Sequence, residues 1–231
     1  NITYVVNRNI NYTNICVYSC SFCAFSKSTG AKKLRGASYL LELEEIQSRV
    51  REAIRRGATE VCLQGGIHPK FDGNYYLDVI KAIRKVSPDI HIHAFSPLEI
   101  FQGAHTLGLT LEEYLPILKE AGLNSLPGTA AEILHDDVRD IICPDKLNTA
   151  EWLSVMDAAH SCGLNSTATI MFGHVETYDH IAEHLINIKN QQIKSGGFTE
   201  FVPLPFVAHE APMSLRGQSR SGPTFREAIL M

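Results

Sequence analysis

Short β-like runs alternate with segments of helical periodicity along the whole chain, and this alternation limits the possible folds more than any other feature. The predicted strands are residues 10–15, 60–63, 90–95, 125–127, 167–172 and 199–202. The predicted helices are residues 43–56, 75–85, 110–121, 149–161, 177–194 and 224–231. Such βα units favour a parallel sheet, because right-handed crossovers place successive strands side by side. The sequence therefore predicts an α/β fold, a partial TIM-like (β/α)6 barrel.

An open doubly wound sheet is the alternative to the barrel. The Gly-x-Gly-x-x-Gly turn that commonly follows the first strand of that fold is absent. Pro116 lies inside the predicted helix 110–121, where the missing N–H is expected to kink or delay the helix.

The composition is that of an ordinary globular chain, with 231 residues of which 45% are hydrophobic and 20% charged. A net charge of −4 without a long run of one sign gives no reason to expect nucleic acid or a membrane surface as partner. We find no long apolar run and no secretory signal, so we expect a cytoplasmic protein. The chain starts at Asn1 and stops at Met231 inside a predicted helix. We therefore expect residues 1–231 to be a single core domain that is truncated at both ends.

Polar and unusual residues follow the predicted strands instead of preceding them. They include Cys16, Cys20, Cys23, Gln64, Gly65, Gly66, His68, His93, Ser96, Thr129, Glu132, Gly173, His174 and Glu176. The carboxyl ends of parallel strands share one face of a barrel, and active sites form there. We therefore expect these side chains to surround one mouth.

The sharpest motif is C-x3-C-x2-C, formed by Cys16, Cys20 and Cys23. Three thiolates so close together can bind one metal centre. Zinc usually takes a fourth protein ligand in structural sites, whereas three cysteines suit a [4Fe–4S] cluster with one open iron. A zinc knuckle or three incidental buried cysteines remain the alternatives. The scattered Cys62 and Cys162, like Cys143, are expected only to pack in the interior.

This spacing, with Phe22 directly before the last cysteine, resembles the radical S-adenosylmethionine (SAM) superfamily. The resemblance implies that the three cysteines ligate a [4Fe–4S] cluster and that its open iron binds S-adenosyl-L-methionine. One electron from the cluster then cleaves the sulfonium, which gives methionine and a 5′-deoxyadenosyl radical.

Other segments resemble the cofactor-binding motifs of the same superfamily. Gln64-Gly65-Gly66 is similar to its glycine motif, where the missing side chains let the backbone approach a ligand. Glu132 could accept hydrogen bonds from ribose hydroxyls, or could be a first-turn carboxylate that stabilises a helix dipole. The segment 173–176, with Gly173 and Glu176, is similar to the adenine-side motif, although Glu176 could instead cap the following helix.

Histidines are the candidates for proton transfer or substrate binding. His68, His93 and His174 are all expected in the mouth, although a lone histidine is more often structural. His91 and His93 alternate with isoleucines, so both are expected to point into the barrel. The remaining helical histidines, including His184, are expected to face solvent.

Longer strings between about residues 7 and 207, such as CSFCAFS, EVCLQGGIHP and GGFTEFVPLPFV, resemble the tyrosine-using branch of the FO synthase family. The resemblance implies transfer of the 4-hydroxybenzyl group of L-tyrosine to 5-amino-6-(D-ribitylamino)uracil in deazaflavin coenzyme (F-420) biosynthesis. Methionine, 5′-deoxyadenosine and 2-iminoacetate are released. Implied partners are an electron donor and a second FO synthase subunit or domain. The alternatives are a related enzyme of futalosine-type menaquinone synthesis and a non-catalytic metal-binding module.

Overall fold

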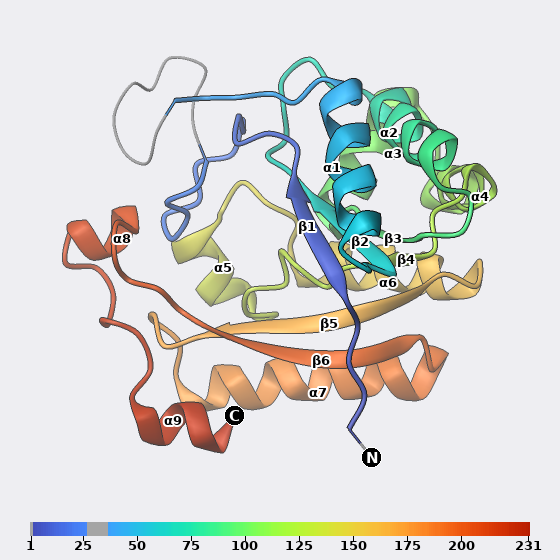
Figure 1. Ribbon diagram of the computed structural model, residues 1–231. Coiled ribbons are helices and arrows are strands. Elements are labelled where there is room, and N and C mark those ends of the chain that lie inside the picture. The colour runs from blue at the N-terminus through green and yellow to red at the C-terminus, as the bar shows by residue number, and fades with distance from the viewer. Residues whose placement is uncertain (1, 27–36) are drawn as a thin grey trace.

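The computed structural model describes residues 2–26 and 37–231, in which six strands form one curled sheet (Figure 1). The strands are β1 (Asn7–Asn11), β2 (Glu60–Gln64), β3 (His91–Ala94), β4 (Ser125–Leu126), β5 (Asn165–Phe172) and β6 (Phe198–Pro205). All neighbouring strands are parallel, and their order in the sheet follows their order in the chain. The predicted partial (β/α)6 barrel is therefore confirmed.

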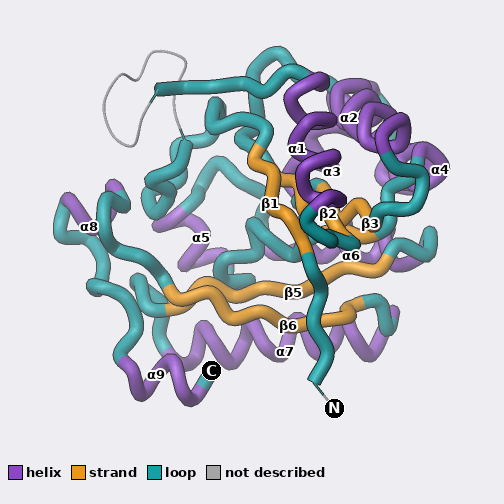
Figure 2. The backbone as a smooth tube through the Cα atoms, viewed as in Figure 1, coloured by secondary structure: helices purple, strands orange, loops and turns teal. Residues whose placement is uncertain are grey.

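Most helices lie outside the strands, as the purple and orange layers of Figure 2 show. They are α1 (Leu43–Arg55), α2 (Gly73–Val86), α3 (Pro97–Leu107), α4 (Leu111–Ala121), α5 (Asp136–Ile142), α6 (Thr149–Ser161), α7 (Tyr178–Ser195), α8 (Pro212–Leu215) and α9 (Phe225–Leu230). Helices α3, α5 and α8 were not predicted. Pro116 lies inside α4, which continues through it to a left-handed Gly122 cap.

The first strand ends earlier than the sequence pattern predicts. It covers Asn7–Asn11 instead of 10–15. The backbone beyond Asn11 has other partners: the Thr13 carbonyl accepts a hydrogen bond from Gly66 N (3.0 Å) and Thr13 forms an isolated antiparallel bridge with Leu40. The segment that carries the cysteines therefore leaves the sheet before they begin.

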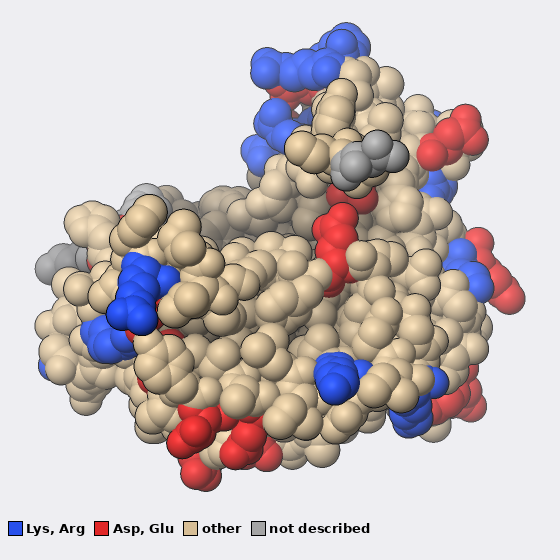
Figure 3. Space-filling view, turned by 90° about the horizontal axis from the view of Figure 1, so that it is seen from below, with Lys and Arg blue, Asp and Glu red and all other residues tan. Residues whose placement is uncertain are grey.

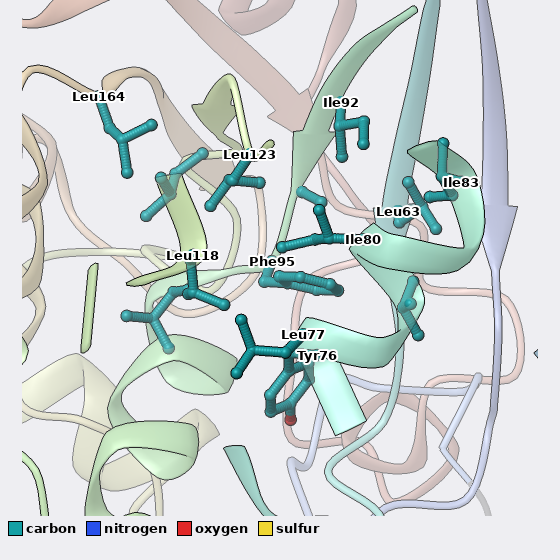
Figure 4. Packing of buried hydrophobic residues seen from close by; sticks show 14 of the residues in the cluster. Leu63, Tyr76, Leu77, Ile80, Ile83, Ile92, Phe95, Leu118, Leu123 and Leu164 are labelled. Atoms are coloured by element: carbon teal, nitrogen blue, oxygen red, sulfur yellow. The ribbon is translucent and has the colours of Figure 1, made fainter. Parts of the chain in front are cut away.

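The main hydrophobic core fills the space between the sheet and helices α2 to α4. Figure 4 shows Tyr76 and Ile80 of α2 beside Phe95, with Leu118 of α4 on the other side. All four side chains are fully buried. Full burial of one such side chain contributes roughly 1.5–3 kcal/mol. This packing fixes the helices against β2 and β3 and so fixes the loops that follow those strands.

In the described residues, no helix is long and apolar enough to cross a membrane. The face seen in Figure 3 carries lysines and arginines in small groups, several of which lie beside aspartates and glutamates. Among the described residues of this face, the lysines and arginines do not form one broad basic patch of the kind that binds nucleic acid.

Candidate active site

A cavity of about 260 Å³ opens where the cysteine loop meets the loops after β2, β3 and β4. Its lining includes Cys16, Cys20, Phe22, Cys23, Gln64, Gly65, Gly66 and Glu132. These residues were predicted as metal or cofactor sites, and the fold brings them together from three separate segments. The lining also includes Tyr18, Ser96, Glu99, Thr129 and Lys146.

The cysteine loop is fastened to its neighbours by backbone hydrogen bonds. Val17 N donates to Ile67 O (2.9 Å) after β2, and Ser21 N donates to Ile142 O (2.8 Å) at the end of α5. Ile67 N in turn donates to the Cys16 sulfur (3.4 Å). These hydrogen bonds hold the cysteine loop against the segments that follow β2 and end α5.

The two glycines after β2 are required by the protein's own packing. A Cβ on Gly66 would lie 2.2 Å from the carbonyl oxygen of Ile15, and one on Gly65 would lie 2.4 Å from the Tyr12 ring. Both distances are below van der Waals contact. The sequence predicts that these glycines admit a ligand; the structure gives the additional reason that they let the cysteine loop lie against β2.

Glu132 forms an ion pair inside the cavity with Lys146, whose Nζ lies 3.0 Å from Glu132 Oε1. Burial alone would raise the pKa of Glu132, but the charge and hydrogen bond of Lys146, together with the charges of Arg139 and His174, hold that pKa below its ordinary value. Burial likewise opposes the charged form of Lys146, but the Glu132 carboxylate, through its charge and hydrogen bond, and the neighbouring Cys20 and Cys143 together raise the pKa of Lys146 above its ordinary value. The sequence carries no signal for Lys146, since a lone loop lysine is usually solvated.

Glu99 is a second carboxylate that the sequence prediction missed. It is buried and accepts hydrogen bonds from the Tyr12 hydroxyl, from Gly65 N (3.3 Å) and from Ser96 N (2.8 Å). Glu99 therefore links α3 to the glycine loop. The available signal was the Ser-x-x-Glu spacing of a capping box directly after the third strand.

Glu99 makes stability depend on pH. Burial raises the pKa of Glu99 from its ordinary 4.5 to about 6, so the folded state holds the proton more tightly than the unfolded state. The protonated Glu99 therefore contributes to the free energy of unfolding fully below pH 4.5, and this contribution is lost as pH rises through 6. The loss amounts to about 2 kcal/mol. We expect the free energy of unfolding of wild type minus that of Glu99→Gln to fall by this amount between pH 4.5 and 7. Urea titrations at these pH values measure it, and a difference that grows with pH would contradict the assignment.

Gly173 and Glu176 do not line the cysteine cavity. Glu176 accepts hydrogen bonds from Gly173 N (2.6 Å) and His174 N (2.8 Å) and pairs with Arg220 (3.0 Å). The cap of α7 is instead Thr177. In the described residues, Glu176 therefore fixes the loop after β5 and the segment that carries Arg220.

The three candidate histidines do not line the cysteine cavity either. The ring of His68 stacks on Phe71 at 4.6 Å, and its Nδ1 accepts a hydrogen bond from Lys70 N (3.2 Å). His174 is fully buried, and its Nε2 lies 3.0 Å from the Met171 carbonyl. Both lie near strand ends, and a protein group contacts one ring nitrogen of each. His174 Nδ1 lies 3.3 Å from Glu176 Oε2 but has no hydrogen-bond partner among the described residues.

His93 lies at the opposite end of the barrel from the position predicted for it. With His91 it lines a separate cavity of about 590 Å³, together with residues at the starts of the strands such as Asn7 and Glu60. Both rings do point into the barrel, and each has a nitrogen 2.7 Å from Ser125 Oγ. The prediction of a shared mouth is wrong because His93 lies within β3, one residue before that strand ends.

His184 also differs from expectation, because it is fully buried instead of facing solvent. Its Nδ1 accepts a hydrogen bond from Leu134 N (2.9 Å). The histidine thus joins α7 to the loop before α5.

The chemistry of the cysteine cavity fits an iron–sulfur cluster with an organic cofactor. In the described parts of the chain, no three His, Cys, Asp or Glu side chains are grouped closely enough to hold one metal ion. A cluster does not need such a group, because each cysteine binds a different iron. Burial raises the pKa of the Cys20 thiol to about 12, so a metal is needed to ionise it at neutral pH. The buried Thr129 Oγ1, which lacks a hydrogen-bond partner among the described residues, could bond a polar ligand.

Comparison with protein families agrees with this chemistry. The sequence of residues 10–186 matches the family model of the Radical SAM superfamily. The chain belongs to this superfamily. Members of the Radical SAM superfamily use a [4Fe–4S] cluster and S-adenosyl-L-methionine, which are the cofactors predicted from the sequence.

Two curated relatives cover nearly the whole chain. The chain is 50% identical over 226 residues to the 5-amino-6-(D-ribitylamino)uracil–L-tyrosine 4-hydroxyphenyl transferase of Methanocaldococcus jannaschii, covering 96% of this chain and 62% of the relative. It is 46% identical over 226 residues to the FO synthase of Streptomyces coelicolor, covering 98% of this chain and 26% of that protein. The chain therefore spans about three fifths of the transferase.

Solved structures with the same fold are more distant in sequence. The crystal structure of HydG, a maturase of the [FeFe]-hydrogenase, aligns with a TM-score of 0.65 at 19% identity and covers 86% of this chain and 42% of HydG. Methylornithine synthase (PylB) aligns with a TM-score of 0.66 at 16% identity, covering 90% of this chain and 56% of the synthase. These similarities concern the fold alone.

Proposed function

We propose that this Radical SAM chain transfers the 4-hydroxybenzyl group of L-tyrosine to 5-amino-6-(D-ribitylamino)uracil in FO and coenzyme F-420 biosynthesis. The observation that carries the proposal is the 50% identity, over 96% of this chain, to the 5-amino-6-(D-ribitylamino)uracil–L-tyrosine 4-hydroxyphenyl transferase of Methanocaldococcus jannaschii. That alignment includes nearly all of a chain whose cavity contains the three cysteines and Glu132.

The residues of the cavity have distinct tasks under this proposal. Cys16, Cys20 and Cys23 hold the cluster, and Phe22, which directly precedes Cys23 in the sequence, lines the same cavity. Gln64, Gly65 and Gly66 offer backbone groups and an amide side chain to the cofactor. When bound, the cluster and S-adenosyl-L-methionine supply a 5′-deoxyadenosyl radical that takes a hydrogen atom from tyrosine and leads to 2-iminoacetate and the 4-hydroxybenzyl group.

The cavity walls also limit side reactions. The chain segment after β1 and the loops after β2 to β4 line the cavity, and its lining includes the buried side chains of Cys20, Glu99 and Glu132. A radical in such a site meets fixed groups instead of solvent. Gly173 and Glu176 support the adenine side only by fixing the loop after β5, and we assign no step to His68, His93 or His174.

The proposal includes partners and a location. An electron donor must reduce the cluster, and a second FO synthase subunit or domain would complete the synthesis. The small share of the Streptomyces coelicolor FO synthase that this chain covers supports such a second part. A cytoplasmic location, where a reducing environment protects thiolates, agrees with the cysteine content. We propose neither nucleic acid nor a membrane as partner.

The test is product analysis by mass spectrometry under anaerobic conditions. We expect reconstituted protein with dithionite to form 5′-deoxyadenosine only when L-tyrosine is present, and to form the hydroxybenzylated uracil when both substrates are present. Omission of tyrosine is the matched control. Turnover of a futalosine-type substrate instead, or a protein that binds zinc and does not cleave S-adenosyl-L-methionine, would reject the proposal.

A further inference from the structure

The ion pair between Lys146 and Glu132 has no assigned task in the proposed reaction. The Lys146 ammonium lies 3.0 Å from Glu132 Oε1 and 5.2 Å from the centroid of the Phe22 ring. The two charged side chains are only 12% and 11% exposed. A complete charge pair is therefore enclosed beside Phe22, which directly precedes Cys23.

The backbone on both sides of the pair is fixed by one buried arginine. Arg139 Nη1 donates to Ala131 O (2.5 Å), next to Glu132, and its Nε donates to Leu147 O (2.8 Å), next to Lys146. Glu132 adopts a left-handed φ of 46°, a conformation that costs free energy and persists only where surrounding contacts impose it.

The pair also has a fixed position relative to the cysteine loop. Lys146 N donates to Cys143 O (3.0 Å) in the turn after α5, and Ile142 at the end of α5 accepts the hydrogen bond from Ser21 N. Ser21 follows Cys20 directly.

We infer that Lys146 and Glu132 together set the reduction potential of the cluster held by Cys16, Cys20 and Cys23. Reduction adds one electron, so a nearby cation stabilises the reduced cluster and a nearby carboxylate destabilises it. The two side chains are largely buried, so water and salt screen their charges less than they screen surface charges. This inference rests on the cluster site of the proposed function.

The two charges predict shifts of opposite sign. Lys146→Met leaves the carboxylate alone and makes the cluster harder to reduce, whereas Glu132→Gln leaves the ammonium alone and makes it easier to reduce. We expect each change to alter the equilibrium constant of reduction about tenfold, which is about 59 mV for a one-electron couple. The double variant returns close to wild type. A redox titration with dithionite as electron source, followed by EPR in the absence of S-adenosyl-L-methionine, measures all four potentials.

Two controls separate charge from structure. Lys146→Arg keeps the charge and is expected to keep the reduction potential of the cluster. Lys194→Met removes an exposed ion pair between Lys194 of α7 and Asp157 of α6 (2.8 Å) and is expected to leave the reduction potential unchanged. Iron content is measured for each variant. If Lys146→Met does not retain four irons, the upward shift of Glu132→Gln decides the inference alone.

The outcomes are distinct. Shifts of the same sign, or potentials unchanged within titration error, overturn the electrostatic inference while a cluster signal leaves the cluster site intact. A wild-type protein without any four-iron signal overturns the cluster site and this inference with it.

Discussion

Cys20→Ala is expected to abolish the cluster and every activity that depends on it. Cys20 is the most enclosed of the three motif cysteines, and its buried side chain lies beside Ile133 and Val138 in a small apolar cluster. Alanine fits that space but supplies no thiolate, so one iron loses its protein ligand. The brown colour, the EPR signal of the reduced cluster and the formation of 5′-deoxyadenosine should fall below about a hundredth of wild type, in line with loss of a metal ligand.

A matched variant distinguishes the motif from cysteine loss in general. Cys162 lies at the end of α6, where its thiol donates to Ala159 O (3.2 Å), and it is absent from the cysteine cavity. Cys162→Ala should keep the iron content and the EPR signal of wild type. Retention of a four-iron signal by Cys20→Ala, or its loss in Cys162→Ala, would show that the motif is not the cluster site.

The barrel is predictable from the sequence because its strongest determinants are local. All six predicted helices match observed helices to within two residues at each end, for example 149–161 with α6 and 177–194 with α7. The prediction is wrong where tertiary contacts, and not the local sequence, determine the secondary structure. The apolar pattern of 10–15 resembles a strand, but the partners of Thr13 lie outside the sheet. Helix α3 was missed because Gly103 and mixed polarity weaken its pattern, although Pro97 follows its Ser96 cap.

The site is predictable where a motif carries its own chemistry. The cysteine spacing identifies three residues that line the cavity, and the position directly after a predicted strand identifies Gln64 and Gly66 as further lining residues. Lys146 could not be predicted, because only the pairing with Glu132 makes an isolated lysine part of a buried site. His93 shows the opposite error: direction into the barrel is encoded by alternation, but the end of the barrel depends on where the strand stops.

Gly66→Ala tests whether the fit between the cysteine loop and β2 is required for the site. The added Cβ would lie 2.2 Å from Ile15 O and 2.9 Å from Cys16 Cβ, and the first of these atoms belongs to the backbone and cannot rotate away. The loop must therefore move, which costs about 1–3 kcal/mol in the free energy of unfolding. A displaced Cys16 should also lower the iron content and weaken S-adenosyl-L-methionine binding at least about tenfold, because misplacement by an ångström has effects of this size or larger.

Gly57→Ala is the control for backbone strain without a clash. Gly57 has a φ of +85°, and an added Cβ would meet no atom within 4 Å. The left-handed conformation costs a non-glycine residue about 1–2 kcal/mol, so both variants should lose stability in urea titrations of the apoprotein. Only Gly66→Ala should lose cofactor binding in isothermal titration calorimetry of the reconstituted protein. If both variants lose the same cofactor affinity, the stability of the protein alone governs cofactor binding. If only Gly66→Ala loses affinity, cofactor binding depends on the contact between Gly66 and the cysteine loop.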